Sequence, residues 1–286
     1  MIPVLSNLEI TPDEFKVVQK FLCDACGIVL NDGKEYLVKS RLGAVLRETE
    51  YNSASDLIKA LRVGNASLAV QARVVDAMTT NETFWFRDAN QFEELKRVIL
   101  PELMKNRAGT LRIWSAASSS GQEPYSISMC VEEFQRSPAA NGFPKKAVQI
   151  VGTDISTSVL EEAKRAVYSD LALSRGLNQD YRSRYFQKCS DGWRLHESIT
   201  SRVRFQQFNL LKPYAALGKF DVIFCRNVLI YFSEDVKRDM IARMAQCLNP
   251  GGYFLLSSTE ALPRGLDILT PAGSGMVRYH RLKGGC

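Results

Sequence analysis

The chain has 286 residues, of which 45% are hydrophobic and 24% are charged, and its formal net charge is +6. These values are ordinary for a soluble globular protein, and no apolar run approaches the roughly 18 residues that a membrane-spanning helix requires. We therefore expect no direct insertion into a membrane. The mild charge permits an acidic partner, but no segment interleaves dense Lys and Arg with aromatic residues as a nucleic-acid groove does, so no nucleic-acid partner is expected.

The N-terminus "MIPVLSNLEITPDEF" lacks a basic segment followed by an apolar core, which argues against secretion. Seven cysteines are spread along the chain without a disulfide framework, which is typical of a reducing cytosol. Cys23 and Cys26 form a CxxC motif with no second pair and no nearby histidine, so we expect them to pack within a helix and expect no metal. The predicted location is the cytoplasm.

The first part of the chain, from residue 11 to about 75, predicts helices only. The stretch "TPDEFKVVQKFLCDACG" offers Thr11 as N-cap, Pro12 at the first helical position and Gly27 at the end. The stretches "KEYLVKSRLGAVLRE" and "SASDLIKALR" predict a second and a third helix from the same spacing of apolar residues. We predict a helical N-terminal domain over residues 1–76.

From about residue 110, short apolar runs alternate with amphipathic stretches, which is typical of a parallel sheet covered on both faces. Buried strands are expected at "LRIW", "VQIVGTD", "VRFQQFNL", "FDVIFCRN" and "GYFLLSS". Helices are expected near 124–136, 157–168 and 234–248, with "NPGG" ending the last one. The tail "MVRYHRL" predicts a final, edge-like strand in a hairpin with "LDILT".

One segment breaks this alternation. Residues 184–203 carry a turn at Asp191-Gly192 between aromatic and charged residues, which predicts a small antiparallel insertion. The predicted fold class is therefore α/β: an open, mostly parallel sheet over residues 77–286, a helical N-terminal domain and a short antiparallel β insertion.

Polar side chains follow each predicted strand, where ligands of open α/β sheets bind. They are Glu123 after the first strand, Asp154 after the second, Asn209 (with Leu210) after the third, Arg226 and Asn227 after the fourth, and Ser257, Ser258 and Glu260 after the fifth. The turn "SAASSSGQEP" lacks the GxGxxG spacing that brings N–H groups to a pyrophosphate. A phosphate-free cation suits this turn, and S-adenosylmethionine is such a ligand.

Asp154 is placed to accept both ribose hydroxyls of that ligand, and Asn209 to read the adenine edge. Two structural alternatives stay open. Asp154 could only assist the cap of the helix near Ser156, and Glu123 could only be a first-turn acid that the helix dipole favours. A further cluster, Phe84 to Phe86 followed by Arg87, could likewise be core aromatics beside a surface charge.

The stretches "TTNETFWFR", "WSAASSSGQEPYSI", "GTDIS…VLEEA" and "FDVIFCRNVLIYF" together resemble the chemotaxis receptor methyltransferases, the CheR family. The resemblance covers nearly the whole chain and implies a Rossmann-like class I methyltransferase sheet. It implies that methyl groups pass from S-adenosyl-L-methionine to glutamates on the cytoplasmic helical region of chemoreceptors, leaving S-adenosyl-L-homocysteine. It further implies that Arg87 and Tyr231 border the reaction centre. The implied cofactor contacts are Asn81, Thr83, Arg87, Glu123, Asp154, Asn209, Leu210, Arg226 and Asn227.

Three features depart from the family pattern, the mildest being a first turn that reads "SSSGQE" where family members often have glycine or threonine. "SSTEAL" follows the fifth strand where a His-Ser-Glu-Asn run is more usual, and the β insertion is short. We therefore expect no binding of the receptor C-terminal pentapeptide that some members grip there. The candidates for contact with an acidic receptor helix are Lys34, Lys39, Arg41 and Arg47, with a scattered solvated surface as the alternative.

A glutamate nucleophile with an ordinary pKa near 4.3 is ionised at pH 7, so the predicted reaction needs no general base. Arg87 is expected to orient the acceptor carboxylate, with Tyr231 as a second contact. Two other functions stay open. One is methyl transfer to another substrate, although "CRNVLIYF" stands where adenine methylation would call for an Asn/Asp-Pro-Pro-aromatic element. The other is a regulatory module that only binds S-adenosylmethionine.

Overall fold

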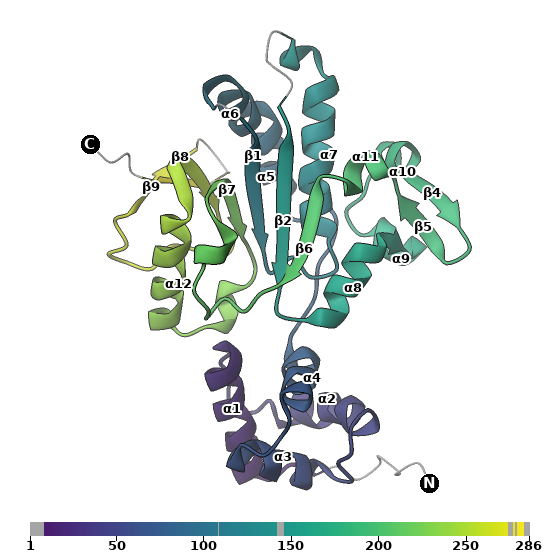
Figure 1. Ribbon diagram of the computed structural model, residues 1–286, viewed down its shortest axis with the longest axis vertical. Coiled ribbons are helices and arrows are strands. Elements are labelled where there is room, and N and C mark those ends of the chain that lie inside the picture. The colour runs from purple at the N-terminus through teal and green to yellow at the C-terminus, as the bar shows by residue number, and fades with distance from the viewer. Residues whose placement is uncertain (1–8, 108, 142–145, 274–276, 278, 283–286) are drawn as a thin grey trace. The chain divides into compact units, whose positions relative to one another are not determined.

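The computed structural model describes residues 9–107, 109–141, 146–273, 277 and 279–282. The chain forms two compact units, shown in Figure 1. The helical unit comprises Met1–Thr80 with Tyr231–Val236, and the sheet unit comprises Asn81–Ile230 with Lys237–Cys286. Within the described ranges, no helix has the length and apolar character to span a membrane. Most of the N-terminal stretch that argues against secretion lies outside these ranges.

The helical unit contains helices α1 (Pro12–Cys26), α2 (Glu35–Arg47), α3 (Ala54–Val63) and α4 (Leu68–Met78). The predicted caps of α1 are confirmed: the Thr11 side chain accepts from the Glu14 N–H, the Glu14 carboxylate accepts from the Thr11 N–H, and Gly27 closes the helix with φ 77°. The apolar stripes of α1 and α2 are buried, as their spacing predicts. Helix α4 is an addition to the three helices located from the sequence.

The sheet unit is built on a seven-stranded sheet in the order β6-β2-β1-β7-β8-β10-β9. Its strands are β1 (Leu111–Ala116), β2 (Val148–Asp154), β6 (Val203–Gln207), β7 (Phe220–Cys225), β8 (Leu248–Leu255), β9 (Leu269–Ala272) and β10 (Tyr279–Leu282). The five predicted parallel strands are confirmed, and β10 pairs antiparallel with both β8 and β9. The strand order reverses between β1 and β7, which places the ligand-binding edge of the sheet there.

Helices before and between these strands bury the apolar faces of the sheet. They are α5 (Ala89–Glu94), the π-helical turn η2 (Leu95–Ile99), α6 (Leu100–Asn106), α7 (Gln122–Arg136), α8 (Thr157–Arg165) and α12 (Glu234–Gln246). Helix α7 packs on β1 and β2, and its residues Ile127, Cys130 and Val131 are fully buried in the core. Figure 1 shows α7 running alongside β2.

Two expectations about the last strands are wrong. Helix α12 ends at Gln246, and "NPGG" lies inside β8, where the pairing with β7 jumps from Phe220–Leu248 to Val222–Tyr253. The Pro-Gly-Gly run therefore forms an irregularity in a strand instead of a helix end. The tail strand β10 lies between β8 and β9, so β9 is the edge strand. The predicted hairpin between these two segments is confirmed.

The antiparallel insertion is present but begins earlier than residue 184. It forms a small sheet in the order β3-β5-β4, and its elements are β3 (Val167–Tyr168), α9 (Asp170–Ser174), α10 (Gln179–Tyr185), β4 (Phe186–Cys189), β5 (Gly192–Leu195) and α11 (Glu197–Thr200). Strand β3 has two residues and pairs with a strand that follows more than twenty residues later, so no local turn reveals it. The predicted hairpin at Asp191-Gly192 is confirmed.

Candidate active site

The carboxyl ends of three neighbouring strands bring the predicted site residues to one edge of the sheet. Ala116 at the end of β1 pairs with Thr153 of β2 and with Cys225 of β7. Asp154 and Arg226, the next residues of those two strands, therefore flank the turn that follows β1. Phe208, after β6, donates its N–H to the Asp154 carbonyl at 2.8 Å, which brings Asn209 to the same edge.

The turn after β1 has a tightly bonded backbone. Ala117 and Ser119 adopt left-handed φ values of 60° and 49°, and Gly121 has φ 93°. A Cβ added at Gly121 would lie 3.0 Å from the Ala163 side chain and 3.1 Å from that of Tyr125, so this position accepts only glycine without displacing a neighbour. Left-handed non-glycine residues are strained and occur where the surroundings hold them, as at binding sites.

Three N–H groups of this turn already have partners in the protein. The Ser118 N–H donates to the Thr153 carbonyl (2.8 Å), the Ser119 N–H to the Asp154 carboxylate (2.8 Å) and the Gly121 N–H to the Ser118 carbonyl (3.1 Å). A pyrophosphate would need these donors for itself. The geometry thus argues against a dinucleotide at this turn.

Asp154 joins two turns at the edge of the sheet. Its Oδ2 accepts from Ser119 and its Oδ1 from the Ser156 N–H at 3.0 Å, and the residue is 7% exposed. The cap of α8 is made by the Ser156 hydroxyl, which accepts from the Val159 N–H. Asp154 therefore does more than support a helix cap, because its other hydrogen bond fixes the turn after β1.

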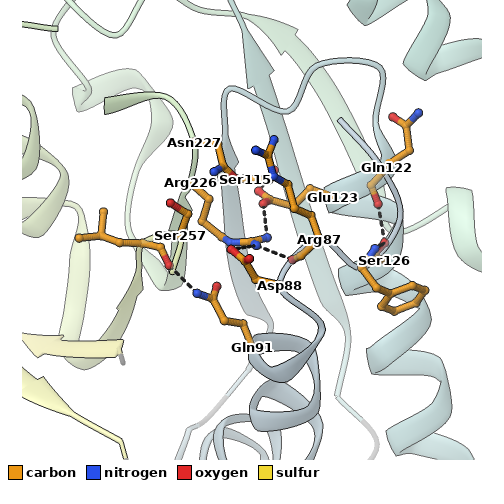
Figure 2. Close-up of polar contacts among 12 residues, drawn as sticks. Arg87, Asp88, Gln91, Ser115, Gln122, Glu123, Ser126, Arg226, Asn227 and Ser257 are labelled. Atoms are coloured by element: carbon orange, nitrogen blue, oxygen red, sulfur yellow. Dashed lines mark hydrogen bonds and ion pairs between the residues drawn. The ribbon is translucent and has the colours of Figure 1, made fainter. Parts of the chain in front are cut away.

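Arg226 forms the centre of a buried ionic cluster with Glu123 and Asp88. Its Nη1 lies 2.8 Å from Glu123 Oε2 and its Nη2 lies 2.9 Å from Asp88 Oδ2, while 1% of its side chain is exposed. The same Nη2 donates to the Arg87 carbonyl, and Glu123 Oε1 accepts from the Ser115 hydroxyl at 2.7 Å. Figure 2 shows the Arg226 guanidinium between the two carboxylates.

The two carboxylates of this cluster respond differently to their surroundings. Burial raises the pKa of Glu123 by more than Arg226 and Ser115 lower it. Burial also raises the pKa of Asp88, but hydrogen bonds from Arg226 and Ser258 outweigh it, so the pKa of Asp88 lies below its usual value of 3.8. Asp88 was not among the predicted site residues. The available signal was its place directly after Arg87, in a stretch already singled out.

Residues 81–88 run beside the turn after β1. The Asn81 carbonyl accepts from the Ser119 hydroxyl at 2.7 Å, and the Phe86 N–H donates to the Ser126 hydroxyl at 3.2 Å. Phe86 and Asp88 have left-handed φ values of 49° and 57°. Thr83 is half-buried within this segment. The segment and the turn after β1 therefore face one another.

The aromatic residues from Phe84 to Phe86 differ in burial. Trp85 is fully buried and Phe86 packs against the core beside Phe92, which confirms the core interpretation for these two residues. Phe84 and Arg87 are half-buried, and the Arg87 guanidinium lies 5.3 Å from the centre of the Phe84 ring. Its Nη1 also lies 3.4 Å from the Glu82 carbonyl oxygen. Neither contact neutralises the charge of Arg87.

The loops after β6 and β7 are held by side-chain hydrogen bonds to their backbone N–H groups. Asn209 Oδ1 accepts from the Leu211 N–H at 2.9 Å, and Leu210 is buried. Asn227 has a left-handed φ of 57°, and its N–H donates to Glu260 Oε2 at 2.7 Å. Glu260, which the sequence places after the fifth strand, thus fixes the backbone conformation of Asn227.

Tyr231 groups with the helical unit, where its carbonyl accepts from the Val29 N–H at 2.8 Å. Its expected place beside Arg87 stays a prediction. Among the basic candidates for receptor contact, Lys34, Lys39 and Arg47 are exposed. Arg41 differs from them, because its guanidinium donates to the Met78 carbonyl (2.6 Å), the Thr79 carbonyl (2.9 Å) and the Thr80 hydroxyl (3.0 Å) at the end of α4. Arg41 is therefore already engaged in holding α2 to α4.

The CxxC motif lies within α1. Cys26 is buried and its thiol donates to the Leu22 carbonyl at 3.1 Å, while Cys23 is exposed. Burial raises the pKa of the Cys26 thiol to about 11. No cluster of three or more potential metal ligands occurs in the described part of the chain. Cys26 thus packs as a small apolar residue.

Comparison with known proteins gives consistent matches. The all-alpha domain of CheR methyltransferases matches residues 13–79, and the SAM binding domain of CheR methyltransferases matches residues 81–274. A chemotaxis protein methyltransferase of Pseudomonas putida, Cher2, is 48% identical over 87% of this chain and 90% of its own. Chemotaxis protein methyltransferase 1 of Pseudomonas aeruginosa is 49% identical over the same shares, and a chemotaxis protein methyltransferase of Vibrio anguillarum is 47% identical over 90% of this chain and 92% of its own.

Proposed function

This chain belongs to the CheR family of methyltransferases, and we propose that it transfers methyl groups from S-adenosylmethionine to glutamate side chains of chemoreceptors. The products would be glutamyl methyl esters and S-adenosylhomocysteine. One structural observation carries the proposal beyond the family match. Three N–H groups of the turn after β1 are committed to β2 and to the turn itself, and the carboxylates of Glu123 in α7 and Asp154 in β2 lie beside this turn. That donor set suits a phosphate-free cation.

The residues that would bind the cofactor come from several different segments along the carboxyl edge of the sheet. Asp154 would accept the ribose hydroxyls, because Ser119 and Ser156 fix the orientation of its carboxylate. Leu210, which is buried beside Asn209, would pack against the adenine. The other proposed cofactor contacts are Asn81, Thr83, Arg87, Glu123, Arg226 and Asn227. When bound, the cofactor supplies an electrophilic methyl group on a sulfonium.

The chain's own contribution to the chemistry is orientation. A receptor glutamate is ionised at pH 7, so its carboxylate oxygen can attack the methyl carbon without a base. Arg87 would orient that carboxylate through a charge-assisted hydrogen bond, which is possible because its guanidinium is not paired with a carboxylate in its described contacts. Alignment and exclusion of water then favour a transition state in which opposite charges cancel. Tyr231 would provide a second contact.

Arg226 has a different role in this proposal. It is too buried to meet a receptor glutamate, and both of its Nη atoms are already bonded, to Glu123, Asp88 and the Arg87 carbonyl. We infer that it shapes the pocket and keeps Glu123 ionised beside the amino-acid end of the cofactor. This inference explains how Glu123, whose pKa is raised by burial, could still bind the positively charged cofactor.

The proposed partner is the cytoplasmic helical region of methyl-accepting receptors, which places the enzyme in the cytoplasm. The division into a helical domain (1–76) and a methyltransferase domain (77–286) is supported by the compact units, whose first boundary along the chain falls between Thr80 and Asn81. The exposed Lys39 on α2 is the candidate for contact with an acidic receptor helix. We do not propose that the β insertion binds a receptor C-terminal pentapeptide.

A labelled-methyl assay on membranes from the source cell tests this function. Transfer of label to a receptor, followed by release of methanol in mild base, is the expected result, because esters hydrolyse and N-methyl groups do not. Label that resists base would favour methylation of another substrate. Binding of S-adenosylhomocysteine with no transfer to receptors would favour the regulatory module.

A further inference from the structure

The β insertion forms one wall around the segment that carries Arg87. The backbone N–H of Trp85 donates to the Arg175 carbonyl at 3.1 Å. The buried Trp85 ring meets Tyr168 and Phe186 of the insertion edge to face, with ring centres 4.9 Å and 5.3 Å away. Such aromatic pairs fix geometry as well as burying area. Tyr168 also donates its hydroxyl to the Ser120 carbonyl at 2.8 Å, so the insertion touches the turn after β1 as well.

The turn at Arg175 and Gly176 lies very close to this segment. A Cβ built on Gly176, whose φ is +89°, would lie 2.0 Å from the Trp85 carbonyl oxygen. This separation is far shorter than any real contact, so a side chain at residue 176 would push residues 81–88 away. Glycine at this position is therefore needed for the approach and for the left-handed backbone alike.

Arg175 is linked to Arg87 by two short routes. The guanidinium carbons of Arg87 and Arg175 lie 5.3 Å and 5.5 Å from the centre of the same Phe84 ring. Glu82 provides the second route, since its carboxylate lies 2.6 Å from Arg175 Nη2 and its carbonyl lies 3.4 Å from Arg87 Nη1. A displacement of Arg175 would therefore shift Arg87 in two ways, through the Phe84 ring and through the backbone of Glu82.

The backbone of this segment needs support from outside. Phe86 and Asp88 flank Arg87, and both have left-handed φ values, which persist only where the surroundings hold them. Arg226 holds one side of the segment through Asp88 and the Arg87 carbonyl. The insertion holds the other side through Trp85.

We propose that the Arg175–Gly176 turn of the insertion is a positioning element for Arg87, so that the insertion takes part in methyl transfer. This inference rests on the proposed function, in which Arg87 orients the acceptor carboxylate. Arg175 acts through Phe84 and Glu82 and is not itself a substrate contact. Gly176 acts through the backbone of Trp85.

The first test compares Arg175→Gln with Arg182→Gln. Arg182 is a matched control, because it also lies in the insertion, pairs with Asp170 at 2.5 Å and covers the Trp193 ring at 4.1 Å, all within the insertion. With receptor substrate, Arg175→Gln should lower kcat about threefold to tenfold, since it loses an exposed ion pair and one ring contact. The melting temperature should stay the same. An Arg175→Gln enzyme as fast as wild type, or an equal loss in Arg182→Gln, would overturn the proposal.

The second test does not depend on activity. Hydrogen exchange at the amides of residues 82–88 should be faster in Arg175→Gln and in Gly176→Ala than in wild type and in Arg182→Gln. Gly176→Ala should also lower kcat about 100-fold, as a displacement of about 1 Å does. Unchanged exchange in Arg175→Gln overturns the proposal whether or not Gly176→Ala folds. If wild type methylates no receptor while the exchange differs as expected, the proposed function fails and the coupling stands.

Discussion

Arg226 donates to Glu123 at 2.8 Å and thereby joins the end of β7 to the first turn of α7 inside the protein. The sequence places both residues at strand ends and treats each as a separate cofactor contact. The structure makes them partners of each other, with Asp88 as the third member. A charge as deeply buried as Arg226 is stable only when it is paired in this way.

Replacing Arg226 by Met should destabilise the fold by about 3–5 kcal/mol, because Glu123 would remain buried without its cation. Urea unfolding measures this loss. Arg184→Met is the control, since Arg184 pairs with Glu133 at the surface, and its loss should cost far less stability because exposed ion pairs contribute little. Equal costs for the two variants would show that the buried cluster does not contribute as we infer.

Asp88→Asn should remove an acid-sensitive part of the stability. The pKa of Asp88 is lower in the folded state than its usual 3.8, so the carboxylate stabilises the fold fully above that pH. This contribution is lost as the pH falls toward the lower folded-state pKa. The difference in unfolding free energy between wild type and Asp88→Asn should therefore shrink as the pH is lowered from about 6 to 3. A difference that is constant over this range, or that grows toward low pH, would contradict the assignment.

Arg41 and Lys39 should behave differently although both are basic residues of α2. Arg41→Ala should lower the stability of the protein by about 1–3 kcal/mol, because three hydrogen bonds to the end of α4 are lost. Lys39→Ala should leave stability unchanged and reduce the salt dependence of receptor binding. Thermal unfolding and binding at two salt concentrations separate these effects. Lys39→Ala with unaltered salt dependence would favour the scattered solvated surface.

Asp154→Asn should weaken the binding of S-adenosylhomocysteine by about tenfold to a hundredfold, as expected for one or two hydrogen bonds to a charged group. Asp221→Asn is the matched control. Asp221 is equally buried, accepts from the Arg112 N–H at 2.9 Å, and lies at the start of β7, away from the carboxyl edge. The Asp221→Asn variant should be less stable than wild type but should bind S-adenosylhomocysteine with unchanged affinity. Equal loss of affinity in both variants would indicate a general effect of burial.

The sheet was predictable because its signals are local. Runs such as "FDVIFC" and "LRIW" are buried on both faces, and caps such as Thr11 with Glu14 mark where a helix begins. The residues at the strand ends followed from the topology, since carboxyl ends of parallel strands meet at one edge. The early start of the insertion was not predictable, because β3 pairs across a long separation in sequence.

The pairing of residues that lie far apart in the sequence could not be predicted either. No local pattern indicates that Arg226 contacts Glu123, 103 residues earlier, or that Arg41 contacts the end of α4. Both arginines look like ordinary charged residues until the fold places carboxylates or carbonyls around them. The left-handed backbone at Phe86 gave no signal either, because bulky side chains rarely adopt that conformation.

Titration calorimetry tests most directly the claim that the carboxyl edge of this sheet takes a phosphate-free sulfonium nucleoside. Wild-type protein should bind S-adenosylmethionine and S-adenosylhomocysteine with measurable heat at one site per chain, and should give no heat with a pyridine dinucleotide. Heat with the dinucleotide and none with either nucleoside would contradict the account.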